Sequence, residues 1–180
     1  YDFTEEALEI LKNKKNLRVL KLAKIEDSLQ PYDMKYLDGK LLVQDKNTTL
    51  AAEYETVTKV EPTKAQLADM EFGMKVVKNM KSNAIAIVKD GETLALGCGQ
   101  TSRIWALKNA IENNQDKNFE GAVLASDAFF PFDDCVTLAN EVGIKAIVQP
   151  GGSMRDKDSI DACNKFEMTM VFTGIRHFKH

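Results

Sequence analysis

The stretch that decides the fold runs Ala122-Val123-Leu124-Ala125-Ser126-Asp127-Ala128-Phe129-Phe130-Pro131-Phe132. Its apolar start predicts a short buried strand, and the polar and aromatic residues that follow predict a loop at the end of that strand. The same order of buried strand and loop recurs at 146–156 and at 168–180. Because ligands of open α/β sheets bind outside the carboxyl ends of the strands, we expect these loops to converge on one ligand site.

Helical patterns lie between these strands, over 134–142 and 155–166. Strand and helix in alternation predict parallel strands joined by crossovers. Upstream, Thr63 and Gln66 have the spacing of a capping box at the start of a helix. The remaining expected elements are helices over 63–80 and 102–113 and a hairpin of strands 84–88 and 93–96 around Asp90-Gly91.

The first third of the chain gives weaker signals. Thr4–Leu11 suits a capped helix, and Leu17–Leu22 alternates like a strand. We expect an arm of short strands and loops over 23–60, with a turn at Asp38-Gly39. The predicted organisation is therefore a helix, a strand and an arm over 1–60, followed by an α/β domain over 61–180.

Composition and charge exclude several classes of protein. The chain has 180 residues, 44% of them apolar, and a formal net charge of −3. Such a charge disfavours non-specific binding to nucleic acid. The chain has no apolar run of the roughly 20 residues that a membrane helix needs, and its acidic start does not suit a secretory signal. We expect a cytoplasmic protein without membrane or nucleic-acid partners, and a first residue other than Met suggests part of a longer polypeptide.

The cysteines and histidines do not form a metal-binding pattern. Cys98, Cys135 and Cys163 are odd in number and widely spaced, which fits a reducing compartment. The sequence contains no C-x-x-C or H-x-E step, and its two histidines are His177 and His180. Zinc-dependent hydrolysis or deamination would therefore lack its ligands, and we expect no metal.

The segment Gly97-Cys98-Gly99-Gln100-Thr101-Ser102-Arg103 opens a helix after a strand. Backbone N–H groups at a helix N-terminus can receive an anion. Arg103 opposes the helix dipole there, so its guanidinium needs an anionic or polar partner. The alternative is that the glycines only permit a tight turn.

Four further features suggest ligand contacts, and three of them have a structural alternative. The rings around Pro131 suit a flat heterocycle, or they pack in the core. Gln149-Pro150-Gly151-Gly152-Ser153 lets the backbone approach a ligand closely, or it is a plain turn with a capping serine. The Arg176 guanidinium suits phosphate or carboxylate, whereas His177 and His180 read as polar residues near the chain end. Asn83 offers an amide that complements a carboxamide, or it serves as a cap or turn residue.

Taken together, these motifs resemble the C-terminal half of aminoimidazole carboxamide ribonucleotide (AICAR) transformylase, which usually occurs with IMP cyclohydrolase in one bifunctional enzyme. The likeness runs through nearly the whole chain. The segments that carry it are Leu41–Asp45, Val76–Lys78, Lys81–Ala84, Gly97–Arg103, Ser126–Phe132, Gln149–Asp156 and Arg176–His180. It implies a three-layer α/β/α, cytidine-deaminase-like fold with a mixed sheet and no zinc.

The resemblance also implies a reaction and a set of site residues. The reaction moves a formyl group from the co-substrate 10-formyltetrahydrofolate to the 5-amino group of AICAR, in purine biosynthesis. Asn83, Arg103, Phe129 and Arg176 match nucleotide-contacting positions, and Ile104, Asp134, Ser153 and Met154 match folate-side positions. Phe130, Pro131, Phe132, Phe178 and His180 are expected as neighbours of the site.

One departure from the family pattern bears on activity. The proton-transfer pair of the family, a lysine and a histidine within K-H-x-N-P-C-G, is absent and belongs to the other half of the transformylase. Asparagine, arginine and aromatic rings position and polarise substrates but make poor general bases. We expect a substrate-positioning half, inactive or weakly active alone, whose partners are that other half and, in the full-length protein, a second copy. A binding or assembly module without chemistry remains the alternative.

Overall fold

The computed structural model describes residues 2–21 and 31–179. The chain forms two compact units, residues 1–46 and residues 47–180, and each unit is described by itself. The domain boundary that the sequence predicts after residue 60 stays a prediction. Residues 55–56 already belong to the sheet of the second unit, where they pair with its last strand.

The first unit begins with α1 (Glu5–Lys12), close to the expected limits. The Thr4 hydroxyl accepts a hydrogen bond from the Ala7 amide at 3.2 Å and caps the helix. The expected strand at Leu17–Leu22 is wrong over residues 17–21, which adopt no strand. Their side chains are exposed, so the alternating pattern buries no apolar face there. Leu22 lies outside the described residues.

The expected arm contains a hairpin of β1 (Tyr32–Leu37) and β2 (Lys40–Asp45). Its turn residues, Asp38 and Gly39, have φ of 44° and 75°. Aspartate and glycine tolerate this left-handed conformation better than other residues, which is why Asp-Gly predicted the turn. Residues 23–30 of the arm lie outside the described residues.

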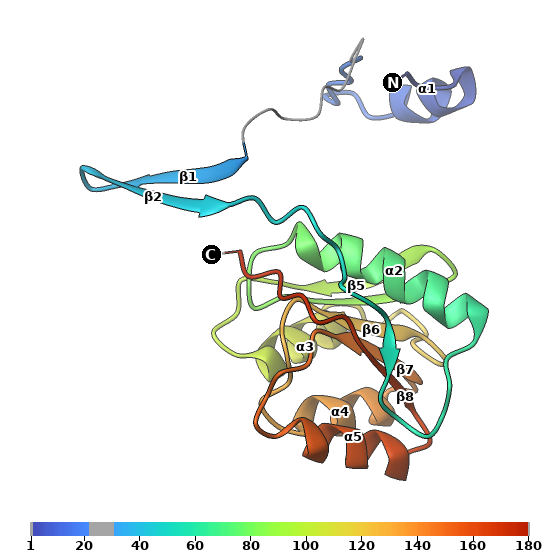
Figure 1. Cartoon of the computed structure of the whole chain (residues 1–180). Helices are drawn as coiled ribbons and strands as arrows, with labels where there is room; N and C mark the ends of the chain where they lie inside the picture. The colour runs from blue at the N-terminus through green and yellow to red at the C-terminus, as the bar shows by residue number, and fades with distance from the viewer. Residues whose placement is uncertain (1, 22–30, 180) are drawn as a thin grey trace. The chain divides into compact units, whose positions relative to one another are not determined.

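The second unit is built on a mixed sheet with the strand order β3-β8-β7-β6-β4-β5 (Figure 1). β6, β7 and β8 are parallel, whereas β4 is antiparallel to both of its neighbours and β3 is antiparallel to β8. The strands are β3 (Glu55–Thr56), β4 (Ile85–Lys89), β5 (Glu92–Gly97), β6 (Val123–Ser126), β7 (Ala146–Gln149) and β8 (Thr169–Phe172).

Helices cover both faces of this sheet, as Figure 1 shows, which confirms the expected three-layer α/β/α architecture. α2 packs on one face, and α3, α4 and α5 pack on the other. Alternate residues of each strand supply the two cores: Leu124 faces the three helices, and Val123 and Ala125 face α2. The helices are α2 (Lys64–Lys78), α3 (Arg103–Glu112), α4 (Asp134–Glu141) and α5 (Asp156–Lys165).

Local sequence explains where two of these helices begin. Thr63 and Gln66 form the expected capping box, with each side chain bonded to the other residue's backbone N–H. The Ser102 hydroxyl caps α3 by accepting from the Trp105 amide at 3.4 Å. α3 also lies so close to β5 that a Cβ atom on Gly97 would overlap the Ala106 carbonyl group. Arg103, the first residue of α3, is thereby fixed relative to the sheet.

Candidate functional site

The loops singled out in the sequence share one edge of the sheet. Parallel pairing puts the carboxyl ends of β6, β7 and β8 at the same edge. Ile85, at the start of β4, pairs with Ser126 on one side and with Gly97 on the other. The ends of β5 and β6 and the residues just before β4 therefore meet at this edge, which confirms the arrangement expected from the strand pattern.

A cavity of about 250 Å³ opens at this edge, beside the N-terminus of α3. Five of the residues singled out in the sequence line it together with residues 101, 102 and 128; the five are Asn83, Arg103, Phe129, Pro131 and Phe178. One wall is polar and comes from residues 83 and 101–103, and the other is largely apolar. Such a cavity can hold a flat polar heterocycle with its edge against Asn83 and Arg103.

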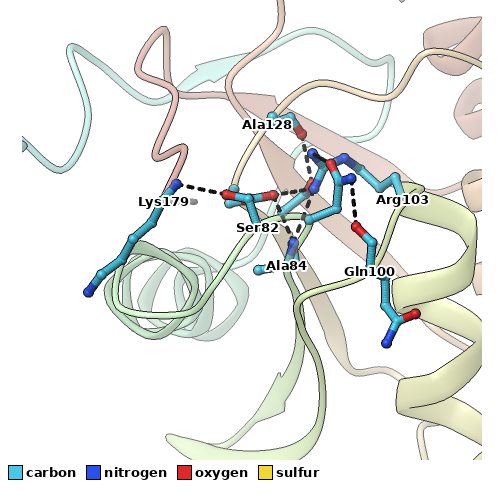
Figure 2. A network of polar contacts seen from close by, with 9 residues as sticks. Ser82, Ala84, Gln100, Arg103, Ala128 and Lys179 are labelled. Atoms are coloured by element: carbon cyan, nitrogen blue, oxygen red, sulfur yellow. Dashed lines mark hydrogen bonds and ion pairs between the residues drawn. The ribbon is translucent and has the colours of Figure 1, made fainter. Parts of the chain in front are cut away.

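The Arg103 guanidinium is held by a buried network (Figure 2). It forms an ion pair with Asp127, and both side chains are shielded from solvent. Nη1 also donates to the Ser126 hydroxyl at 3.0 Å, and Nη2 donates to Oδ1 of Asn83 at 2.7 Å. The partner that the sequence demanded for Arg103 is therefore supplied within the chain by Asp127.

Asn83 is fixed from both ends of its amide. While Oδ1 accepts from Arg103, Nδ2 donates to the Gln100 carbonyl at 2.9 Å. The backbone N–H of Asn83 donates to the same carbonyl at 3.1 Å. The loop before β4 and the loop before α3 are thus joined at the polar wall of the cavity.

Arg176 lies on the loop after β8, and its guanidinium carbon lies 5.1 Å from the centre of the Phe129 ring. Arg176 is exposed and Phe129 is half-buried, so this cation–π pair stands at the rim of the apolar wall. The planar cation remains accessible to a phosphate or a carboxylate.

The positions that match the folate side do not line this cavity. Ile104 packs half-buried against the core, and Asp134 is the first residue of α4, where its carboxylate accepts from the Cys135 amide at 2.8 Å. The Ser153 hydroxyl accepts from the Arg155 amide at 3.1 Å, and the neighbouring Met154 is fully exposed.

The structure separates the other expected neighbours of the site. Phe130 is fully buried in the core between the sheet and α3–α5. Phe132 is exposed, and the guanidinium carbon of Arg155 lies 4.9 Å from the centre of the Phe132 ring. His180 lies outside the described residues.

His177, which the sequence indicated only as a polar residue near the chain end, is part of the interior. Its ring is fully buried. Nε2 lies 2.9 Å from the Leu50 carbonyl, and Nδ1 lies 2.8 Å from the Asn47 amide nitrogen. A neutral ring that donates from Nε2 and accepts at Nδ1 satisfies both contacts. Burial is the main cause that lowers the pKa of His177 below its ordinary value, and the Lys78 charge acts in the same direction.

A second cavity, of about 390 Å³, lies beside α4 and α5 and was not foreseen. The sequence signal that could have indicated it is the helical spacing of Asp158, Asp161 and Lys165 on one face of α5. Its lining residues are Asp133, Thr137, Arg155, Asp158, Asp161, Ala162, Lys165 and Phe166.

The described residues contain neither a candidate metal cluster nor a helix that could span a membrane. No group of three or more His, Cys, Asp or Glu side chains there could hold a metal ion. No described helix has both the length and the apolar character needed to cross a bilayer.

Comparison with known proteins identifies the family. The model of the AICARFT/IMPCHase bienzyme family matches residues 1–113. The chain belongs to this family. The bifunctional purine biosynthesis protein PurH of Clostridioides difficile is 80% identical over 180 residues, and that of Clostridium perfringens strain SM101 is 58% identical over 179 residues. The AICARFT/IMPCHase chain described here spans about a third of the length of these relatives, 35% and 34% respectively.

Solved structures give weaker likenesses. The dCMP deaminase of cyanophage S-TIM5 aligns with a TM-score of 0.43 at 19% identity, over 61% of this chain and 97% of the deaminase. A deaminase/reductase of Thermotoga maritima aligns with a TM-score of 0.37 at 24% identity, over 63% of this chain and 35% of that protein. Scores this low carry no inference about chemistry.

Proposed function

We propose that this chain is the substrate-positioning part of an AICAR transformylase, which transfers a formyl group from 10-formyltetrahydrofolate to the 5-amino group of AICAR. The observation that carries the proposal is the cavity in which Asn83, Arg103 and Phe129 meet at the sheet edge. Membership of the AICARFT/IMPCHase family supports it.

The polar wall suits the carboxamide and the imidazole of AICAR. Nη2 of Arg103 donates to Asn83. A guanidinium Nη carries two N–H groups, and we propose the second one as the donor to an acceptor on AICAR. The Phe129 ring offers a face for stacking a heterocycle, and Arg176 above it offers a cation for the ribotide phosphate.

The chemistry requires more than these residues provide. As the AICAR amine forms a bond to the formyl carbon, the carbonyl becomes an oxyanion and the amine must lose a proton. The bond from the formyl carbon to N10 of the folate then breaks, and that nitrogen takes up a proton. Among the cavity-lining residues within the described part of the chain, none has a carboxylate, imidazole, amine or thiol that could act as the base.

We therefore propose that the base comes from the other half of the transformylase and that the chain alone is inactive or weakly active. Positioning two substrates can lower a barrier considerably, but it does not replace a proton acceptor. A homodimer of the full-length protein is part of this proposal. The second candidate is a nucleotide-binding module without chemistry, and the lack of a base in the cavity favours it.

The folate is proposed to lie further along the same sheet edge, near Ile104, Asp134, Ser153 and Met154. Ser153 and Met154 follow β7, whose carboxyl end shares the edge with β6. An exposed methionine beside a serine can contact a pterin ring and its polar edge.

We propose that the protein lies in the cytoplasm, since Cys98, Cys135 and Cys163 are free thiols.

Calorimetric titration of AICAR into the 180-residue chain tests the nucleotide site. We expect saturable binding that weakens about tenfold or more in Arg176→Ala, because a hydrogen bond to a charged group is lost. Arg155→Ala is the matched control, since Arg155 also lies over a phenylalanine ring, but that ring belongs to Phe132, which does not line the cavity as Phe129 does. If AICAR does not bind, or if both variants weaken it equally, the proposed site is wrong.

A complementation assay separates the two candidate functions. The chain is mixed with a separately purified polypeptide that covers the rest of a relative's length, and formyl transfer from 10-formyltetrahydrofolate to AICAR is measured. Turnover by the mixture, with little from either part alone, supports the transformylase. If the chain binds AICAR but the mixture shows no turnover, the binding module is the better description. Rapid turnover by the chain alone would reveal a base within these residues and refute the positioning role.

A further inference from the structure

Asp127 is a fully buried carboxylate directly after β6 that does not line the cavity, although the next residue, Ala128, does. Its Oδ1 accepts from the Ala84 amide at 3.1 Å and from Arg103. Its Oδ2 accepts from the Ser82 hydroxyl at 2.6 Å. Figure 2 shows the polar network to which these contacts belong, with Ser82, Ala84 and Arg103 labelled. A buried anion with this many donors fixes every group that points at it.

The Oδ1 branch leads to the polar wall of the cavity. Arg103 is held by Asp127 at one nitrogen and supports Asn83 with the other. Without the carboxylate, the guanidinium would be a buried cation without a counter-charge, which is strongly unfavourable. We expect it to turn towards solvent and to release Asn83.

The Oδ2 branch leads to the opposite wall. The Ser82 hydroxyl accepts from the Lys179 amide at 2.8 Å, and the Ser82 amide donates to the Lys179 carbonyl at 2.8 Å. The backbone carbonyl of Asp127 also accepts from the His177 amide at 2.8 Å. Phe178, which lines the cavity, lies between these two tethered residues.

We propose that Asp127 is the positioning residue of the nucleotide cavity and sets both walls at once, through Arg103 and through Ser82. This inference rests on the proposed function, because it takes AICAR as the occupant. Asp127 acts through Arg103 and the tethered tail and touches no substrate. The negative charge of Asp127 is needed because an asparagine amide would not neutralise the Arg103 guanidinium. Such an amide would also turn an N–H towards one of the groups that donate to the carboxylate.

The test is a double-mutant cycle on AICAR affinity, measured by calorimetry with the 180-residue chain. The variants are Asp127→Asn, Arg103→Gln and the double variant, in which both buried charges are removed together and neither is left without its counter-charge. We expect Asp127→Asn to weaken binding about tenfold or more when Arg103 is present. In the Arg103→Gln background we expect a further loss no larger than that of Ser82→Ala alone, because the charged group on which Asp127 acts is gone and only its link to Ser82 remains.

Asp69 provides the matched control. It is a carboxylate of similar burial that accepts from the Asp90 and Gly91 amides at 2.9 and 2.8 Å. Those residues form the turn between β4 and β5, at the end of β4 away from the cavity. Asp69→Asn should lower the melting temperature and leave AICAR affinity unchanged, so a loss of stability alone does not explain a loss of affinity.

Ser82→Ala tests the second branch and keeps the Arg103–Asp127 pair. We expect it to weaken binding less than Asp127→Asn does, through the loosened tail around Phe178. The inference is overturned if Asp127→Asn binds like the wild type, if it loses the same affinity in both Arg103 backgrounds, or if Asp69→Asn weakens binding as much. Failure of the wild type to bind AICAR would instead refute the proposed function.

Discussion

Gly97→Ala is the substitution whose effect the structure predicts most sharply. A Cβ atom at this position would lie 2.7 Å from the Ala106 carbonyl carbon and still closer to its oxygen. To restore an ordinary contact of 3.4 Å with that carbon alone, α3 must move by at least about 0.7 Å. The obstacle is backbone, so a change of rotamer does not relieve it.

The expected loss is therefore at the upper end for overpacked sites, about 3 kcal/mol or more in the free energy of unfolding. That corresponds to roughly a 150-fold fall in the ratio of folded to unfolded chain. Because Arg103 opens the displaced helix, AICAR affinity should fall as well.

Urea denaturation followed by fluorescence measures this loss, since Trp105 is the only tryptophan in the sequence and lies in the first turn of α3. Gly99→Ala is the control. Gly99 has a φ of +67°, and a Cβ there would meet nothing within 4 Å, so backbone strain of about 1–2 kcal/mol is the whole expected effect. The reasoning is refuted if Gly97→Ala loses less than about 1 kcal/mol, or if Gly99→Ala loses more than Gly97→Ala does.

Three further predictions concern stability and reactivity. The lowered pKa of His177 means that the unfolded chain binds a proton more readily, so stability should fall as the pH drops below about 6.5 and should be insensitive to this group above it. Urea titrations from pH 7.5 to 5 should show a shallower decline in His177→Gln, and equal slopes would contradict the prediction. Cys98 is exposed, whereas burial raises the pKa of Cys163 to about 12 and also raises the pKa of Cys135. A thiol reagent should therefore modify only Cys98 quickly in the native chain and all three cysteines in denaturant. Rapid modification of more than one cysteine in the native chain would be inconsistent with the packing. Thr63→Ala removes the cap of α2 and should lower the unfolding free energy by about 1 kcal/mol, which thermal denaturation beside Thr63→Ser can check.

The second half of the fold could be predicted because its signals are local. The buried strands at 123–126 and 146–149 are short apolar runs bounded by glycine, proline or aspartate, and the helices between them have helical periodicity. These signals depend on nearest neighbours along the chain. The limits of the elements accordingly agree with the expectation to within a few residues.

Pairing between distant segments could not be predicted in the same way. Leu17–Leu22 has a strand pattern, but residues 17–21 adopt no strand because alternation gives a strand only where a partner and a buried face exist. β3 shows the opposite case, since the two residues Glu55 and Thr56 carry no pattern and pair with β8 through tertiary structure. Both outcomes depend on partners that are far away in the sequence.

The location of the candidate site could be predicted from the sequence, but only some of its contacts could. Strand order brought Asn83, Arg103 and Phe129 to one edge, as the loops indicated. Sequence reasoning required a polar partner for Arg103 but could not name Asp127, because the two residues meet only when α3 and β6 pack together. The burial of His177 was missed for the same reason, since its partners precede it by more than 120 residues.

The tethering of residues 177–179 to the start of β4 has a consequence for biosynthesis. The sheet needs residues only as far as Phe172, but one wall of the cavity needs Phe178 and the Ser82–Lys179 hydrogen bonds. A polypeptide whose synthesis stops between Phe172 and Phe178 would contain all strands of the sheet but lack one wall of the cavity. Nonsense changes between the codons for Phe172 and Phe178 should therefore leave every strand of the sheet but remove one wall of the pocket, so that the product no longer binds the ligand.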